Sequence, residues 1–250
     1  MSDGKGEVFL VGAGPGDPGL ITVKGKAVIE KADVIVHDFL IPKELLSFAK
    51  KGTEIIDVSK RGGEHLVEQK VINEILLEKA KEGKTVVRLK GGDPFLFGRG
   101  GEEAEFLKRH GIDVHVIPGV TSAIAVPALA GIPVTHRDYS SAFTVVTGHE
   151  SAEKEKEVLN WDALSSIGGT IVILMGVSAM ERNIERLLAG GLDPETPVAV
   201  IERGATAEER VVTGSLSKIS EICRRESIRP PALIVIGHVV SLRNILGDLR

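Results

Sequence analysis

Short apolar runs alternate with helical patterns along the whole chain. In the first half, the runs that predict strands are Val8–Val11, Asp33–His37, Glu54–Val58, Thr85–Leu89 and Val114–Ile117. Helical periodicity lies between them, near residues 22–31, 42–50, 66–82 and 101–110. In the range 66–82 the apolar residues recur at a spacing that gathers them in one stripe on a helix. This alternation is typical of an α/β fold with a mainly parallel sheet.

The pattern is interrupted between residues 118 and 140, where prolines and glycines are frequent. Because these residues break regular structure, we expect a short helix over Thr121–Leu129 and then an extended linker. A second α/β set follows, with strands predicted at Phe143–Thr147, Thr170–Met175, Pro197–Glu202, Arg210–Thr213 and Ala232–Ile236 and helices near 157–165, 178–189, 215–225 and 240–246. The short connection between the third and fourth of these strands predicts a mixed sheet. The predicted domains are 1–118 and 141–250, joined by the segment 119–140.

Composition and charge narrow the classes of function. The net charge of −4 argues against general nucleic-acid binding, which depends on a basic surface, and 4% aromatic residues leave little to stack bases on. The seven histidines show no metal-ligand spacing, and the single cysteine excludes an internal disulfide. We therefore expect no metal site. No apolar run reaches the roughly 18 residues of a membrane helix, and the N-terminus has no signal-peptide pattern, so we expect a cytoplasmic protein.

The first predicted strand is followed by the glycine-rich loop GAGPGDPGLIT (12–22). Its position is that of a dinucleotide-binding G-x-G-x-x-G, with Asp38 where the ribose-binding acid would stand. However, Asp17 occupies the third glycine position, and Pro15 and Pro18 delay the helix to about Thr22. The Asp17 carboxylate would also repel a pyrophosphate. The loop suits a ligand without phosphate, while a nicotinamide-dependent dehydrogenase remains the alternative.

Four further segments also follow predicted strands. The loop GGDPFLFGRGGEE (91–103) contains five glycines, which let a backbone approach a ligand closely, although a surface turn before a helix is the simpler alternative. Thr121 and Ser122 begin the short helix, where free N–H groups and the two hydroxyls can hold a polar ligand. A helix cap is an equally good interpretation of Thr121. Met175-Gly176 and Glu202–Ala205 end two strands of the second half. Because ligands of α/β sheets lie beyond the carboxyl ends of strands, these segments predict a cleft between the two domains.

These segments resemble the S-adenosylmethionine-dependent tetrapyrrole methylases, and among them the enzymes that methylate uroporphyrinogen III. The resemblance runs from about Val8 to about Ile236 and is carried by GAGPGDPGLITVKG (12–25), KRGGEHLVEQKVIN (60–73), RLKGGDPFLFGRGGEE (88–103), PGVTSAIAVPALAGIPVTHRD (118–138), TGH (147–149), LMG (174–176), PVAVIERGA (197–205) and PALIVIG (231–237). It implies the tetrapyrrole methylase fold, two α/β domains with a cofactor cleft between them, and not a standard Rossmann methyltransferase.

The resemblance also implies which residues contact S-adenosylmethionine. They are Pro15, Gly91, Gly92, Asp93, Leu96, Thr121, Ser122, Met175, Gly204 and Ala205. The chemistry agrees, because a sulfonium cation, an amino acid head and adenosine require backbone polar groups and apolar cover rather than a phosphate cradle. For Asp93, capping of the following turn is the alternative role.

The implied substrate is uroporphyrinogen III, a macrocycle with eight carboxylates. It would explain the basic residues in or beside the loops, since arginine binds a carboxylate bidentately, although solvated surface charges are the alternative. These residues are Lys60, Arg61, Arg88, Lys90, Arg99 and Arg137. The family pattern makes Asp38 the candidate proton acceptor and Lys60 the candidate proton donor. In the same pattern, the candidate residues for substrate binding or proton abstraction are Arg99, Glu102 and Arg137. Arg99 is better suited to anchoring a carboxylate, because guanidinium stays protonated, and Glu102 is alternatively a first-turn helix residue.

One departure and several alternatives accompany the resemblance. Phe39 stands where the family pattern has a substrate-binding arginine, which leaves carboxylate recognition on that side open. The dehydrogenase and chelatase module of some relatives is missing from the sequence, so we expect a methylase alone. The family implies a homodimer that supplies precorrin-2 for sirohaem or cobalamin-type cofactors. The alternatives are methylation of a later precorrin, of diphthamide or of ribosomal RNA, and non-catalytic tetrapyrrole binding.

Overall fold

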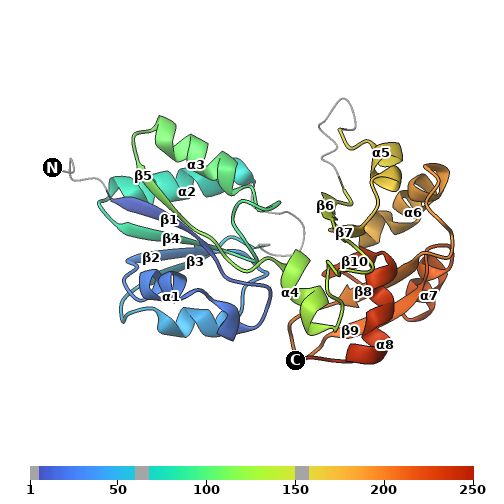
Figure 1. The fold of residues 1–250 in the computed structure, drawn as a ribbon. Coiled ribbons are helices and arrows are strands. Elements are labelled where there is room, and N and C mark those ends of the chain that lie inside the picture. The colour runs from blue at the N-terminus through green and yellow to red at the C-terminus, as the bar shows by residue number, and fades with distance from the viewer. Residues whose placement is uncertain (1–5, 60–67, 150–157) are drawn as a thin grey trace. The chain divides into compact units, whose positions relative to one another are not determined.

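The computed structural model describes residues 6–59, 68–149 and 158–250 (Figure 1). The chain divides into two compact units, Met1–Thr121 and Ser122–Arg250. Each unit contains one five-stranded sheet with helices packed on it. The finer division at residues 118 and 140 stays a prediction.

The sheet of the first unit is wholly parallel, with strand order β3-β2-β4-β1-β5. This confirms the predicted parallel sheet. The strands are β1 (Glu7–Gly12), β2 (Val34–His37), β3 (Glu54–Asp57), β4 (Thr85–Lys90) and β5 (Asp113–Ile117). The helices are η1 (Pro18–Leu20), α1 (Val23–Ile29), η2 (Lys43–Phe48), α2 (Gln69–Lys81) and α3 (Gly100–Arg109).

Helices cover both faces of this parallel sheet. Leu10 faces the side on which α2 and α3 pack, and the next residue, Val11, faces the side of α1 and η2. In Figure 1 the two pairs of helical segments accordingly lie on opposite sides of the strands. Alternate residues of a strand point to opposite faces, so a central strand buried on both sides is apolar almost throughout. The two polar residues of β4 that break this rule, Arg88 and Lys90, therefore need an explanation.

The second unit contains a mixed sheet with strand order β6-β7-β10-β8-β9, which confirms the predicted mixed pairing. Strand β6 runs parallel to β7, whereas β10 is antiparallel to both β7 and β8. The strands are β6 (Phe143–Thr147), β7 (Thr170–Leu174), β8 (Pro197–Glu202), β9 (Arg210–Ser215) and β10 (Ala232–Ile236). The helices are α4 (Ser122–Leu129), α5 (Trp161–Ser166), η3 (Val177–Ala179), α6 (Met180–Ala189), α7 (Ile219–Arg225), η4 (His238–Leu242) and α8 (Arg243–Leu246).

One apolar core cluster of the second unit lies where α5, α6 and α7 cover the sheet. Leu164, Ile184 and Cys223 from these three helices pack with inward-facing strand residues such as Ile173 and Val200. Burial raises the pKa of the Cys223 thiol to about 11, so this thiol stays protonated and unreactive at neutral pH. Within the described residues, no helix is long and apolar enough to cross a membrane.

The element boundaries differ from the predicted ones in ways that have local causes. The range 42–50 forms the 3₁₀ segment η2 instead of an α-helix, and the range 240–246 divides into η4 and α8. Strand β9 continues to Ser215, because Ser215 pairs with Pro197, so α7 begins only at Ile219. Strand β7 ends at Leu174, since Met175 turns into the left-handed region with φ 54°.

Candidate functional site

Three loops of the first unit leave neighbouring strands at the same edge of the sheet. Strands β4, β1 and β5 are adjacent and parallel, so the loops that begin after Lys90, Gly12 and Ile117 lie side by side. The first two loops form a small antiparallel bridge, in which Gly92 N donates to Gly14 O at 2.7 Å and Gly14 N donates to Gly92 O at 3.3 Å. Their backbones are thus fixed against each other.

The third loop joins them by an approach that only glycine allows. A Cβ atom added to Gly12 would lie 2.5 Å from both N and Cα of Gly119 and 2.6 Å from Gly92 O. These are backbone atoms, which cannot move aside as the end of a side chain can. The three glycines therefore interlock the loops at residues 12–16, 91–98 and 118–121, and we call this arrangement the glycine interlock.

Asp93 ties two of these loops together through backbone amides. Its Oδ1 accepts from Phe95 N at 2.9 Å, and its Oδ2 accepts from Gly119 N at 3.0 Å. The predicted alternative role as the cap of the following turn is thus present, together with a second contact that the sequence did not indicate. A carboxylate oxygen can accept more than one hydrogen bond, so these contacts leave acceptor capacity for a ligand.

The loop after β1 does not have the geometry of a dinucleotide-binding turn. Asp17 caps the short segment η1 by accepting from Gly19 N at 2.7 Å, and α1 begins at Val23 behind its own cap, Thr22. The predicted delay of the helix to about Thr22 is therefore confirmed. The N–H groups of the helix N-terminus are separated from Gly12 by this extra segment, so the usual device for a pyrophosphate is not formed here.

Two predicted segments of the second unit also share one edge of their sheet. Strands β7 and β8 are both antiparallel to β10, so they run in the same direction and Met175 and Gly204 follow the same ends. Met175 is 53% exposed, which is unusual for a residue that would ordinarily be in the core. Gly204 packs against helix α4, where a Cβ atom added to it would lie 2.7 Å from Cγ2 of Val126.

The loop after β8 is held in a strained conformation by Glu209 and the C-terminal Arg250. Ala205 has φ 61°, and its N–H donates to Glu209 Oε2 at 2.8 Å. The Glu209 carboxylate is 1% exposed and lies 3.7 Å from Arg250 Nε, while Arg250 Nη1 donates to Thr206 O at 3.2 Å. The residues at the end of the chain therefore brace the backbone that carries Gly204 and Ala205, a connection that no sequence pattern indicated.

A buried network of charges lies beneath the loops of the first unit. Glu103 Oε1 accepts from Lys90 Nζ at 2.9 Å and from Arg88 Nε at 3.1 Å, and Arg88 also pairs with Asp38. Gln69 Nε2 adds a third donor to the same Glu103 oxygen at 3.1 Å. The exposed fractions of Arg88, Lys90 and Glu103 are 2%, 3% and 0%. We call these five residues the buried network.

This network corrects one expectation drawn from the sequence. Arg88 and Lys90 were grouped with basic residues free to bind substrate carboxylates, but both are buried and paired inside the protein. They lie on β4, a central strand covered on both faces, so their side chains cannot reach solvent. Glu103 is not among the candidate site residues predicted from the sequence. Charged residues at alternate positions of a central strand almost always need buried partners, and this was the available signal.

Burial also changes the ionisation of the network. Loss of solvation lowers the pKa of the Lys90 ammonium, and the nearby Arg88 lowers it further, while Glu103 and Asp38 oppose the shift. Glu103 Oε2 is buried without a hydrogen-bond partner among the described residues. Asp38 is the part of the network that reaches solvent, since its side chain is 33% exposed.

The remaining candidate residues are placed as follows. Arg99 has φ 58° at the start of α3 and donates to Glu102 through Nη2 at 2.6 Å, and both side chains are more than half exposed. This pairing holds the pKa of the Glu102 carboxyl below its ordinary value. Arg137 is exposed in the turn closed by the hydrogen bond from His136 N to Ser140 O. Lys60 and Arg61 lie outside the described residues.

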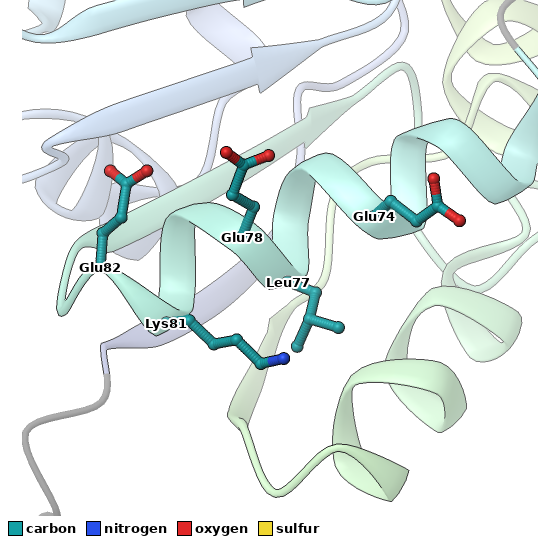
Figure 2. Close-up of a pocket in the computed structure, with 5 residues that line it drawn as sticks. All are labelled: Glu74, Leu77, Glu78, Lys81 and Glu82. Atoms are coloured by element: carbon teal, nitrogen blue, oxygen red, sulfur yellow. The ribbon is translucent and has the colours of Figure 1, made fainter.

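Surface hollows lie along α2 in the first unit and beside η3 and α6 in the second. Figure 2 shows one of about 480 Å³, lined by Glu74, Leu77, Glu78, Lys81 and Glu82 along α2. Glu82 comes just before β4 begins at Thr85, so this hollow faces the amino ends of the strands, opposite to the glycine interlock. Its lining is mainly carboxylates, which suits neither an acidic macrocycle nor an apolar cofactor surface.

Comparison with known proteins gives consistent matches over nearly the whole chain. Residues 7–220 match the family model described as Tetrapyrrole (Corrin/Porphyrin) Methylases. A Methanocaldococcus jannaschii uroporphyrinogen-III C-methyltransferase is 56% identical over 238 residues, covering 95% of this chain and 98% of that protein. A Methanosarcina barkeri S-adenosyl-L-methionine-dependent uroporphyrinogen III methyltransferase is 53% identical over 250 residues, covering 100% and 98%.

A solved structure matches the fold as well. The uroporphyrin-III C-methyl transferase of Thermus thermophilus, complexed with S-adenosyl homocysteine, superposes with a TM-score of 0.82 at 39% sequence identity. The match covers 95% of this chain and 100% of that one. Both sheets and their helices are therefore shared with a protein that holds the product form of a methyl donor.

Proposed function

The chain belongs to the tetrapyrrole (corrin/porphyrin) methylases, and we propose that it transfers methyl groups from S-adenosylmethionine to two carbons of uroporphyrinogen III. The observation that carries this proposal is the identity of 53% and 56% to two uroporphyrinogen III methyltransferases over nearly the full chain. The product is precorrin-2, the precursor of sirohaem and cobalamin-type cofactors. The fold is that of the tetrapyrrole methylases and not that of the standard Rossmann methyltransferases.

The loops fit S-adenosylmethionine in chemical terms. The glycine interlock brings three loop backbones together without Cβ atoms between them, and the loop after β1 lacks the helix N-terminus that a pyrophosphate would need. Met175, exposed at a strand end, offers an apolar and polarisable surface. We therefore assign to the cofactor Pro15, Gly91, Gly92, Asp93, Leu96 and Thr121 in the first unit and Ser122, Met175, Gly204 and Ala205 in the second.

The methyl donor supplies an electrophilic methyl group on a sulfonium, and the protein's residues supply alignment and proton removal. The glycine interlock and Asp93 fix the loop positions before binding, which lowers the entropy lost when donor and acceptor are aligned. Asp38 is assigned as the acceptor of the proton that the macrocycle loses. Its side chain reaches the edge of the sheet where these loops lie.

The carboxylates of the macrocycle require cations that are exposed. Arg99 and Arg137 meet this condition, whereas Arg88 and Lys90 do not. Glu102 is assigned to orienting Arg99, because it accepts two hydrogen bonds from the Arg99 guanidinium. Lys60 is retained as the proton donor of the family pattern, although it lies outside the described residues.

The function is tested by incubating the purified protein anaerobically with methyl-labelled S-adenosylmethionine and uroporphyrinogen III. The expected result is a labelled tetrapyrrole, with two labels per macrocycle, that fluoresces red after oxidation. Absence of any labelled macrocycle would overturn the proposal. Calorimetry adds a second criterion, since binding of NAD without binding of S-adenosylhomocysteine would point to the dehydrogenase alternative instead.

We extend the proposal to assembly and location. The protein acts as a homodimer in the cytoplasm, as the family pattern implies, on a small-molecule substrate and without nucleic acid or membrane. Light scattering of the purified protein should give twice the chain mass of 26.6 kDa. A mass equal to one chain at assay concentration would contradict the dimer.

A further inference from the structure

The buried network has one closed end and one open end. Glu103 lies at the closed end, 0% exposed, and Asp38 at the open end with a side chain that is 33% exposed. Arg88 and Lys90 connect them: Arg88 pairs with both carboxylates, and Lys90 Nζ lies 2.9 Å from Glu103 and 3.9 Å from Asp38. Two cations and two carboxylates thus balance inside the protein.

Stability alone is a poor reason for such a network. Replacing buried ion pairs with well-packed apolar side chains is often neutral or stabilising, because desolvation costs about as much as the pairing returns. The network is also placed at a particular point, since Asp38 follows β2, the neighbour of β4, at the edge where the loops of the glycine interlock begin. Buried charges that lead to a single exposed carboxylate at a ligand edge suggest control of that carboxylate.

We propose that Glu103 and Lys90 are positioning residues for Asp38: Glu103 holds Lys90 and Arg88 in place by hydrogen bonds, and these two cations orient the Asp38 carboxylate at the edge of the site. This inference rests on the proposed function, in which Asp38 accepts a proton from the macrocycle. Arg88 orients Asp38 directly, since its Nη2 donates to Asp38 Oδ1, and Arg88 Nε is held in turn by Glu103.

The charged and titratable groups around this centre come from three elements. From β2, His37 Nδ1 lies 3.0 Å from Asp38 O. From β4 come Arg88 and Lys90, and from α3 come Glu103 and Glu102, whose carboxylate interacts electrostatically with Lys90. The residue that α2 contributes, Gln69, is neutral. Among the described residues, therefore, Glu103 is the buried carboxylate in hydrogen-bond contact with Lys90.

The direction of the pH effect follows from these contacts. Burial already lowers the pKa of Lys90, and Glu103 opposes that shift, so neutralising Glu103 lowers the pKa of Lys90 further. Loss of the Lys90 proton removes one of the two cations that face Asp38. Activity should therefore fall at a lower pH once Glu103 is neutral, whereas an arginine at position 90 would keep its charge throughout.

The experiment measures kcat against pH for the wild-type protein, Glu103→Gln, Lys90→Arg and the control Glu105→Gln, which lies exposed on the same helix. We expect the alkaline limb of the profile to move down by about one pH unit in Glu103→Gln and upward in Lys90→Arg. It should stay within about 0.2 units in Glu105→Gln. The affinity for S-adenosylhomocysteine should change less than about twofold in all variants.

A purely structural network gives a different result. In that case Glu103→Gln lowers thermal stability and kcat equally at every pH, and unmoved limbs in both variants would overturn the inference. If Glu103→Gln does not fold, Lys90→Arg decides alone, because an alkaline limb at the wild-type position contradicts a role for Lys90 ionisation. Glu103→Asp, which keeps the charge, should restore the wild-type limb. Failure of the wild-type protein to methylate uroporphyrinogen III would instead overturn the proposed function.

Discussion

The loops after β1, β4 and β5 of the first unit and the loop after β8 of the second unit are fixed by different means. In the first unit, the loops after β1, β4 and β5 touch through backbone atoms, and Asp93 links two of them by hydrogen bonds to amides. In the second unit, the loop after β8 is held by side chains: Val126 packs under Gly204, and Glu209 holds Ala205 N. The loops of the first unit are therefore held mainly by close backbone approach, and the loop after β8 by side chains.

This difference implies different tolerance to change. Backbone atoms of three packed loops have nowhere to move, so a new Cβ atom there must displace a whole loop. A side chain in the same position can be shortened, which creates the space that a new Cβ atom needs. Substitutions at Gly12 should consequently have large effects that cannot be compensated, and substitutions at Gly204, in the loop after β8, smaller effects that can.

Gly12→Ala should have the largest effect. The new Cβ atom would lie 2.5 Å from Gly119 backbone atoms, and we expect a loss of stability of about 3 kcal/mol. Affinity for S-adenosylhomocysteine should fall by about 100-fold or more. Thermal unfolding and calorimetry measure the two quantities. Gly101→Ala is the control, because its Cβ atom would lie 3.5 Å from the Phe95 ring in ordinary contact. Equal binding by Gly12→Ala and the wild type would mean that the interlock does not shape the site.

Asp93→Ala should weaken cofactor binding by about 30-fold, which corresponds to about 2 kcal/mol, because the carboxylate's hydrogen bonds to the Phe95 and Gly119 amides are lost. Calorimetry with S-adenosylhomocysteine measures the change. The affinity of Asp93→Asn for S-adenosylhomocysteine should lie between those of the wild type and Asp93→Ala, because an amide retains one acceptor oxygen. Asp113→Ala, at a carboxylate 79% exposed in the same unit, is the matched control. An unchanged affinity in Asp93→Ala would separate this residue from the cofactor loops.

Gly204→Ala tests the second unit, and we expect an affinity loss of about tenfold. Its Cβ atom would lie 2.7 Å from Cγ2 of Val126, so the double variant Gly204→Ala with Val126→Ala should recover to within about threefold of the Val126→Ala single variant. Calorimetry of all three variants forms a double-mutant cycle. A comparable second-site rescue is not expected for Gly12→Ala. Recovery in neither case would remove the distinction between the two units.

Arg137→Ala should have the smallest effect on binding of the cofactor and a selective effect on the substrate. Arg137 is exposed, so we expect KM for uroporphyrinogen III to rise about fivefold, in line with about 1 kcal/mol for one solvated ion pair. Affinity for S-adenosylhomocysteine should be unchanged. Steady-state kinetics and calorimetry separate the two. Arg109→Ala, an exposed arginine on α3, is the control. The reverse outcome, lost cofactor affinity with normal KM, would contradict the assignment.

The sequence was informative where local chemistry decides the structure. Alternating apolar runs predicted both sheets, and Pro15 and Pro18 correctly predicted that α1 starts late. The motifs indicated which loops lie at strand ends. The family resemblance, borne out by the comparisons, supplied the cofactor and the substrate class.

The sequence was uninformative where contacts between segments far apart in the chain determine the structure. Arg88 and Lys90 look like free cations in a motif, and only the central position of β4 shows that they must be paired with Glu103. Arg250 and Glu209 are separated by 41 positions, and no periodicity connects them although they brace one loop. Met175 was assigned to a strand, because its left-handed conformation is imposed by the turn and not by its own preference.

The glycine interlock also sets limits for protein engineering. A variant library aimed at a different methyl acceptor would lose most of its members if Gly12 and Gly119 were randomised, since every other residue adds atoms where backbones already touch. Phe39 and Phe95, which are 72% and 53% exposed after the ends of β2 and β4, have space on one side and are the better positions to diversify. Selectivity for the methyl acceptor is therefore more easily changed at exposed positions such as Phe39 and Phe95 than in the glycine interlock.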